Sequence, residues 1–202
     1  KNISKIEMDV LRNDQVIGYS NYSFTHSENE MSVTNDTQFE VELFGVKIFS
    51  IISKSIEKYE NDKLVFFKSN TLQNNKKKFV DLKYEKNTNN FLIYGSSYKG
   101  TASLDNVIGN WWNHKILQSD SQISPLSGSI KEQVITFIGK EKINLYEKEY
   151  FTHRFKLKSK DLSLPEEKKL DFDIWFEPKK NLILKVGYNR MGYWEYKLKN
   201  LK

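Results

Sequence analysis

The segment Met31–Phe44, "MSVTNDTQFEVELF", alternates between apolar and polar side chains and decides the fold class. Its apolar members all occupy odd positions: Met31, Val33, Phe39, Val41 and Leu43. A helix repeats every 3.6 residues and cannot produce this pattern, whereas a half-buried antiparallel strand does. At about 3.3 Å per residue such a strand is about 45 Å long, which is typical of barrels or strongly curved sheets.

The same alternation recurs on both sides of this segment, with Asn- and Asp-rich turns between the strands. Such clusters occur at Asn13-Asp14, Asn61-Asp62, Asn74-Asn75 and 87–90. Asn and Asp tolerate a positive φ and therefore suit hairpin turns. The strand after the segment places Val46, Ile48, Ile52 and Ile56 on one face. Residues 1–100 are therefore predicted to form an antiparallel meander of long strands.

Strand patterns resume in residues 129–202, where Gly139-Lys140-Glu141 is predicted to be a turn. Residues 101–128 interrupt the alternation, and Ser103–Asn106 precedes "VIGNWWNHKILQ" as a candidate helix cap. We expect one short helix near Gly109–Leu117 and a loop after it. No repeat or linker separates the parts, so we predict a single all-β domain over 1–202, curved into a barrel or half-barrel.

The composition argues against several classes of function. The net charge is +6, but the chain has only three arginines, and its lysines are interleaved with acids instead of gathered on one element. Arginine is the residue that best recognises phosphates and guanine edges, so we expect no nucleic-acid partner. The longest apolar run, "FGVKIFSII", is interrupted by Lys47 and is too short for an integral membrane segment.

The sequence also lacks the usual signs of catalysis, metal binding or a cofactor. There is no cysteine, and none of the histidines (His26, His114 and His153) has a ligand partner at metal-binding spacing. Pairs of acids such as Asp171 and Asp173 are ordinary on the polar face of a strand. No nucleophile or phosphate-loop motif occurs. We therefore expect a protein that is not an enzyme and that binds no metal or cofactor.

The candidate ligand-binding residues are Trp111, Trp112, Asn113 and His114, in the segment that breaks the alternation. One hypothesis is a plug, in which a tryptophan and nearby aliphatic residues fill the open end of the curved sheet. The other is a pocket, in which the two indole rings bind an apolar ligand and Asn113 and His114 supply polar contacts. Adjacent aromatics on a buried connector usually pack, which favours the plug.

Several short motifs, in order along the chain, resemble a family of exported, uncharacterised β-proteins of Gram-negative bacteria, classed as a domain of unknown function. These motifs are Ile17-Gly18 after a turn, Trp112-Asn113, Ser127-Gly128, and a late aromatic strand that ends in a turn. Before that turn the family usually carries an aromatic-Asp pair, whereas this chain has Phe176-Glu177. The resemblance implies a periplasmic location and a signal peptide before Lys1, and the chain indeed begins Lys1-Asn2-Ile3 without an initiator methionine. It supplies no catalytic residues.

Three functions follow from this sequence. The first is a non-enzymatic periplasmic binding or carrier protein for an apolar or lipid-like ligand, by analogy with lipid-carrying half-barrels. The second is a structural or assembly protein of the cell envelope that contacts a protein partner, which an interior without a cavity would favour. The third is an envelope hydrolase, which would need two convergent carboxylates or a histidine–carboxylate pair in one cleft.

Overall fold

The computed structural model describes residues 3–202, and their fifteen strands form one open, curved sheet. The strands are β1 (Lys5–Arg12), β2 (Gln15–His26), β3 (Glu30–Leu43), β4 (Val46–Glu60), β5 (Lys63–Gln73), β6 (Lys76–Glu85), β7 (Asn90–Gly95), β8 (Lys99–Ala102), β9 (Val107–Ile108), β10 (Ser121–Ile123), β11 (Ile130–Leu145), β12 (Lys148–Ser159), β13 (Asp171–Glu177), β14 (Leu182–Asn189) and β15 (Tyr193–Leu201). Two short 3-10 helices span His114–Gln118 and Glu166–Lys168. The predicted all-β fold with long strands is confirmed.

The sheet consists of two meanders that meet through the ends of the chain. Its order is β8-β7-β6-β5-β4-β3-β2-β1-β15-β14-β13-β12-β11-β10-β9, so β1 pairs with β15 in the middle and β8 and β9 form the two edges. The pairing is antiparallel except between β9 and β10. Asn13, Asn61 and Asn74 adopt a positive φ in their hairpins, as their turn chemistry predicts.

Strand β3 has the two-sided pattern that its sequence predicts. Val33, Phe39 and Val41 are buried on the inner, concave face of the sheet. Thr37 lies on the same face, where its hydroxyl group is 2.7 Å from that of Ser20 on β2. The concave face is therefore partly polar, and its buried hydroxyl groups satisfy each other.

Strand β4 presents most of its aliphatic residues to solvent. Ile52 lies on the outer face and is 45% exposed, but Val46, which is 62% exposed, does not share that face as predicted, because the bulge between Val41 and Glu42 places it opposite Leu43. The face that turns inward carries Ile51, Glu57 and Tyr59, all buried. The register with β3 explains this orientation, because Ile51 lies opposite the buried Phe39 and both side chains point to the concave face.

The predicted short helix in the middle of the chain is present, but it is a 3-10 helix that starts at His114 and not near Gly109. Val107–Ile108 pairs with β10, so these backbone groups are used in the sheet, and part of the predicted loop after the helix is a strand. Gly109 sits against Gln122, whose Oε1 atom lies 1.9 Å from the position a Cβ would take. Asn113, and not the Ser103–Asn106 segment, caps the single helical stretch that remains, a 3-10 helix.

The predicted turn at Gly139 is also wrong, because β11 runs through it. A β-bulge between Phe137 and Gly139 shifts the register against β12, and the strand continues to Leu145. The turn falls at Tyr146, which adopts a positive φ. A bulge bends a strand without ending it, and its sequence signal, a glycine within an alternating run, is the same as that of a turn.

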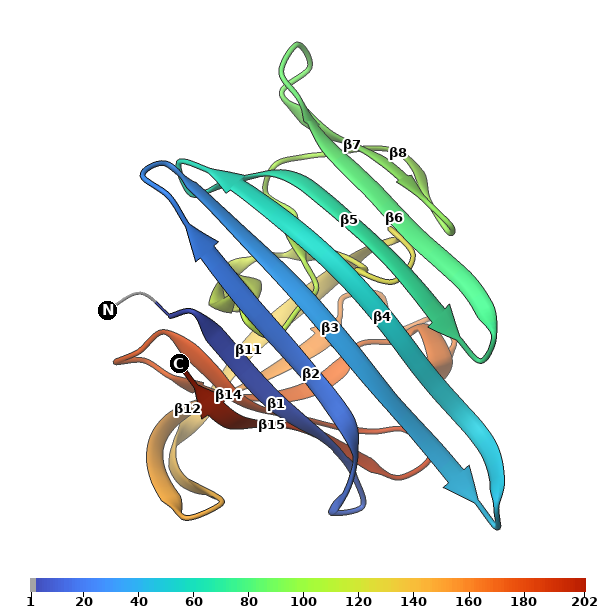
Figure 1. Cartoon of the computed structure of the whole chain (residues 1–202), viewed down its shortest axis with the longest axis vertical. Coiled ribbons are helices and arrows are strands. Elements are labelled where there is room, and N and C mark those ends of the chain that lie inside the picture. The colour runs from blue at the N-terminus through green and yellow to red at the C-terminus, as the bar shows by residue number, and fades with distance from the viewer. Residues whose placement is uncertain (1–2) are drawn as a thin grey trace.

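The connector, residues 103–129, lies on the concave face between the two meanders (Figure 1). Its Ile108 and Ile123 pack in the cluster formed by β5, β6 and β7, with Phe67 at the centre. Its Ile116 packs in another cluster with Leu157 and residues of β13 and β14. The core is thus assembled around the connector, which touches both halves of the sheet.

Candidate functional site

The buried carboxyl group of Glu57 lies on the concave face of β4 and forms hydrogen bonds with residues of the connector. The residue is 2% exposed. Its carboxyl oxygens accept hydrogen bonds from the hydroxyl of Tyr59 at 2.6 Å, the Nδ2 atom of Asn110 at 2.7 Å and the indole nitrogen of Trp112 at 2.9 Å. Two of these three donors come from the connector, so Glu57 anchors it to the sheet.

Burial makes this acid easier to protonate than a carboxyl group in water. Desolvation raises the pKa of Glu57 to about 7, although the three donors oppose the shift because they stabilise the carboxylate. The pKa of Tyr59 is raised as well, first by burial and then by the charge of Glu57. The site therefore changes charge near neutral pH, which few carboxyl groups do.

Trp111 and Trp112 fill the space above Glu57 with aromatic contacts. The ring of Trp112 meets those of Phe24 and Tyr59 edge to face, with centroids 5.3 and 5.8 Å apart. Trp111 lies against Phe172 from the other half of the sheet, at 5.1 Å. Both tryptophans are half-buried and pack against the core, which is the arrangement of a plug.

Asn113 and His114 do not face a space shared with the two indoles. Asn113 is buried, and its Oδ1 atom accepts a hydrogen bond from the backbone nitrogen of Lys115 at 3.1 Å to cap the 3-10 helix. His114 points away and stacks on Phe176 of β13 at 5.7 Å. Partial burial lowers the pKa of His114, which keeps the imidazole neutral at physiological pH. That these four residues bind a ligand stays a prediction.

His114 begins a line of neighbouring rings, one pair stacked and three pairs edge to face, which we call the aromatic row: His114, Phe176, Phe155, Phe137 and His153. Successive ring centroids are 5.7, 6.4, 5.5 and 5.6 Å apart, and the rings come from the connector, β13, β12 and β11. Phe155 is directly opposite Ile174, which is fully buried on the concave face. The row therefore lies on the concave side, yet Phe137 is 51% exposed.

Sequence reasoning missed Glu57, Asn110 and the aromatic row. A signal for Glu57 exists in β4, because Lys54 and Lys58 share the face of the exposed isoleucines and mark it as the solvent side. The opposite face, formed by the odd-numbered residues, is then the inner one, and it carries the acid Glu57 together with Ile51 and Tyr59. The row has no local signal, since it joins residues that are far apart along the chain.

Asp171 and Asp173, the paired acids considered in the sequence, form ion pairs with basic side chains. Asp173 accepts hydrogen bonds from Arg154 at 2.8 Å and Lys156 at 3.0 Å, which lowers the pKa of Asp173 despite its partial burial. Lys156 also pairs with Asp171. Within residues 3–202, no three side chains of His, Cys, Asp or Glu gather as metal ligands. The paired acids of β13 are thus part of an ion-pair network.

Two open hollows of about 420 and 440 Å³ occur in the described part of the chain. The first lies between the connector and β11, near Gln133, and the second lies over β2, β3 and β4, near Asn35. Neither is lined by Trp111 or Trp112. No helix within residues 3–202 is long and apolar enough to cross a membrane.

The fold is similar to the crystal structure of a beta-barrel-like protein of domain of unknown function DUF1849 from Brucella abortus. The TM-score is 0.66, and the alignment covers 98% of this chain and 96% of that chain at 9% sequence identity, so the likeness concerns the fold alone. No curated protein matches the sequence. Residues 8–199 match the domain of unknown function DUF6134, which confirms the prediction of an uncharacterised domain family. The chain therefore belongs to the DUF6134 family of domains of unknown function.

Proposed function

We propose that this chain is a non-enzymatic binding protein that takes an apolar or lipid-like ligand on the aromatic row. The observation that carries the proposal is the exposure of Phe137, which is 51% exposed although its ring contacts Phe155 on the concave side of the sheet. An exposed aromatic next to half-buried ones offers a ready apolar surface, and exposed apolar surface of this kind often marks a binding site.

The chemistry of the row suits an elongated apolar molecule with a polar end. The three phenylalanines supply ring faces and edges, while His114 and His153 at the two ends supply nitrogen atoms for hydrogen bonds. Trp111 and Trp112 then hold His114 in place from the side of the core, since Asn113 and the 3-10 helix connect them rigidly to His114. In this proposal the tryptophans position the row and do not contact the ligand.

A periplasmic location belongs to the same proposal. A carrier of apolar molecules between two membranes needs a covered, stable fold, and the absence of cysteine is compatible with an oxidising compartment. Fractionation of the native host, with antibody detection of this chain, tests the location directly. Recovery in the cytoplasmic fraction would remove this part of the proposal and leave ligand binding to be judged separately.

The test of ligand binding is native mass spectrometry of the protein purified from its own host, followed by lipid extraction. The matched assay is titration of the purified protein with cis-parinaric acid, a fluorescent fatty acid. Phe137→Ser and Phe155→Ala are expected to weaken binding about tenfold or more, since each removes a buried aromatic contact with the ligand. Tyr94→Ala, an exposed ring on β7, is the control and leaves binding unchanged. A clean apo mass together with no binding of the fatty acid would reject the proposal.

A second candidate, an envelope assembly protein that acts through protein contacts, is favoured by one specific observation. The connector occupies the concave face, and its anchors to Glu57 leave the centre of that face filled with side chains. A filled interior suits a scaffold whose outer surface does the binding. Chemical cross-linking in the native host separates the two candidates, because a stable protein adduct without a lipid adduct would support the scaffold.

A further inference from the structure

Residues 40–50 form a two-stranded arm that extends beyond the rest of the sheet. The pairing of β3 with β2 starts only at Phe39, and that of β4 with β5 starts at Ile51. Between these points β3 and β4 pair only with each other, and the edges of the arm are free except at its base, where Ser50 bonds to Asn74. Figure 1 shows this hairpin as the projection at the lower right of the molecule.

The tip of the arm is apolar and exposed. Phe44 is 97% exposed, and the neighbouring exposed residues are Leu43, Val46 and Ile48. The turn itself does not call for an aromatic residue, because Phe44 and Gly45 both adopt a positive φ, which favours Asn followed by Gly. Other hairpins of this chain use the pairs Asn13-Asp14, Asn61-Asp62 and Asn74-Asn75. Phe44 therefore stabilises neither the turn nor the core.

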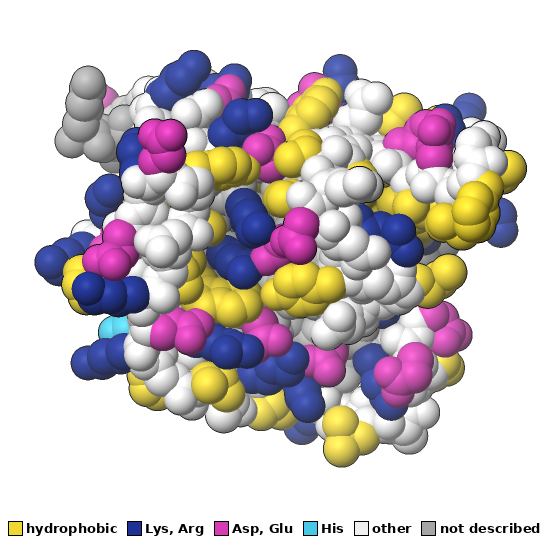
Figure 2. Space-filling view, turned by 90° about the horizontal axis from the view of Figure 1, so that it is seen from below, with side chains coloured by type: hydrophobic (Ala, Val, Ile, Leu, Met, Phe, Trp, Pro, Cys, Tyr) yellow, Lys and Arg dark blue, Asp and Glu magenta, His cyan; other side chains and the backbone are white. Residues whose placement is uncertain are grey.

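A group of lysines lies beside the base of the arm. The next turn, between β5 and β6, is tied to the arm because the backbone nitrogen of Ser50 donates to the side chain of Asn74 at 2.8 Å. Three consecutive lysines, Lys76–Lys78, follow that turn, and Lys76 and Lys77 are exposed. Of the two glutamates of the arm, Glu40 is neutralised by an ion pair with Lys47. Figure 2 shows the molecule from below, with hydrophobic, basic and acidic side chains next to one another on this side.

We propose that the arm docks on the surface of an anionic lipid bilayer. The five or so residues from the base to the tip span about 15 Å. Apolar anchors of peripheral proteins enter the boundary of headgroups and acyl chains by about 5–10 Å. When Phe44 and Val46 reach that depth, Lys76 and Lys77 lie at the level of the lipid phosphates, where each lysine attracts anionic headgroups. The proposal is independent of ligand binding on the aromatic row, since it uses other residues.

The experiment is co-sedimentation of the full chain with vesicles, either pure phosphatidylcholine or an equal mixture of phosphatidylcholine and phosphatidylglycerol. The wild type is expected to bind the anionic vesicles and to bind the neutral ones at least tenfold more weakly. Phe44→Asn creates the preferred Asn-Gly turn, so it is expected to raise the midpoint of thermal unfolding. The same variant is expected to lose about tenfold or more in vesicle affinity. Opposite changes in stability and binding separate docking from misfolding.

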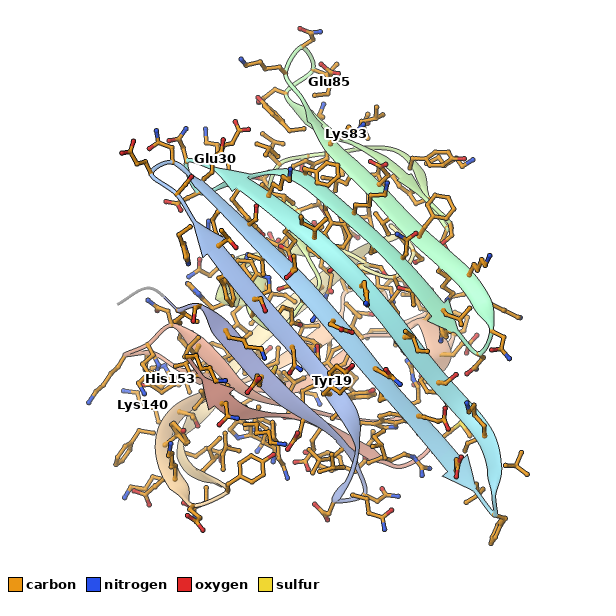
Figure 3. The ribbon with its side chains drawn as sticks, in the orientation of Figure 1. Tyr19, Glu30, Lys83, Glu85, Lys140 and His153 are labelled. Atoms are coloured by element: carbon orange, nitrogen blue, oxygen red, sulfur yellow. The ribbon has the colours of Figure 1, made fainter. Side chains whose placement is uncertain are left out.

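The contribution of charge is tested with a matched pair of double variants. Lys76→Gln with Lys77→Gln is expected to lower the affinity for anionic vesicles about tenfold. Lys83→Gln with Lys86→Gln, at the other end of β6, is expected to leave the affinity unchanged; Figure 3 shows Lys83 far from the arm. Equal binding to both kinds of vesicle, or to neither, overturns the proposal. Self-association in sedimentation velocity that Phe44→Asn abolishes overturns it too, because the arm then binds a second copy.

Discussion

The side chain of Asn110 donates a hydrogen bond to the buried carboxyl group of Glu57 across 2.7 Å and so attaches the connector to the middle of the sheet. Trp112 donates to the same oxygen atom at 2.9 Å. Glu57 is thus linked to residues of the connector that lie more than fifty positions later in the chain. Because the pKa of that acid is raised to about 7, the strength of the attachment depends on pH.

The first prediction is that stability falls as the pH rises toward neutral. The pKa of Glu57 moves from an ordinary 4.5 to about 7 in the folded protein, so between these values the folded state binds more protons than the unfolded state. The contribution of this group is therefore complete below pH 4.5 and is lost as the pH passes 7. It amounts to about 3 kcal/mol. Urea unfolding at pH 5, 6, 7 and 8 measures it.

Glu57→Gln is the matched variant for this prediction. The amide keeps an oxygen acceptor for Asn110 and Trp112 but does not titrate in this range. The slope of unfolding free energy against pH is expected to shrink in the variant by the part that Glu57 contributes. An unchanged slope would show that other groups cause the pH dependence.

A second prediction compares the two adjacent tryptophans. Trp112→Phe keeps an aromatic ring against Phe24 but removes the donor to Glu57, which leaves a buried acceptor with one partner fewer. Such losses cost about 1–3 kcal/mol. Trp111→Phe is the control, since the ring of Trp111 makes contacts with Phe172 and its indole nitrogen bonds no other described residue. Equal losses in urea unfolding would contradict a special role for the hydrogen bond.

The all-β class of this fold can be predicted from the sequence because it depends on the local alternation of polar and apolar residues. Met31–Phe44 shows this, since burial follows its period and gives β3. Alternation does not say which face is inside when both faces carry apolar groups. In β4 the isoleucines at 52 and 56 lie outside while Glu57 lies inside, because pairing with β3 fixes the register.

The candidate site was only partly predictable for a different reason. Trp111 and Trp112 stand out in the sequence because they interrupt a regular pattern, and the structure places both on the concave face. Their partners Glu57 and Tyr59 come from a strand about fifty residues earlier, and Phe172 comes from one about sixty residues later. Such long-range contacts leave no trace in local periodicity, so neither the acid nor the aromatic row was expected.

A third prediction concerns the cap of the 3-10 helix. Asn113→Ala removes the side-chain oxygen that accepts from the backbone of Lys115, and loss of such a cap costs about 1 kcal/mol. Asn113→Ser retains a capping oxygen and is expected to recover most of that stability. The stacking of His114 on Phe176 depends on this helix, so the proton resonances of His114 should shift in the alanine variant alone. Shifts of the same size in both variants would mean that the cap does not hold His114.

The last prediction tests whether the connector must lie against the sheet. A Cβ atom at Gly95, in β7, would stand 2.4 Å from the backbone oxygen of Ser127, so Gly95→Ala has to push the connector away. The expected loss is about 2 kcal/mol, the usual cost of overpacking. The amide of Ser97, which donates to the same Ser127 oxygen at 2.9 Å, should then exchange its hydrogen faster. Gly139→Ala is the control, because nothing lies within 4 Å of its Cβ position, and it is expected to be neutral or slightly stabilising. If both variants unfold at the same urea concentration and Ser97 keeps its protection, the connector is not held by this contact.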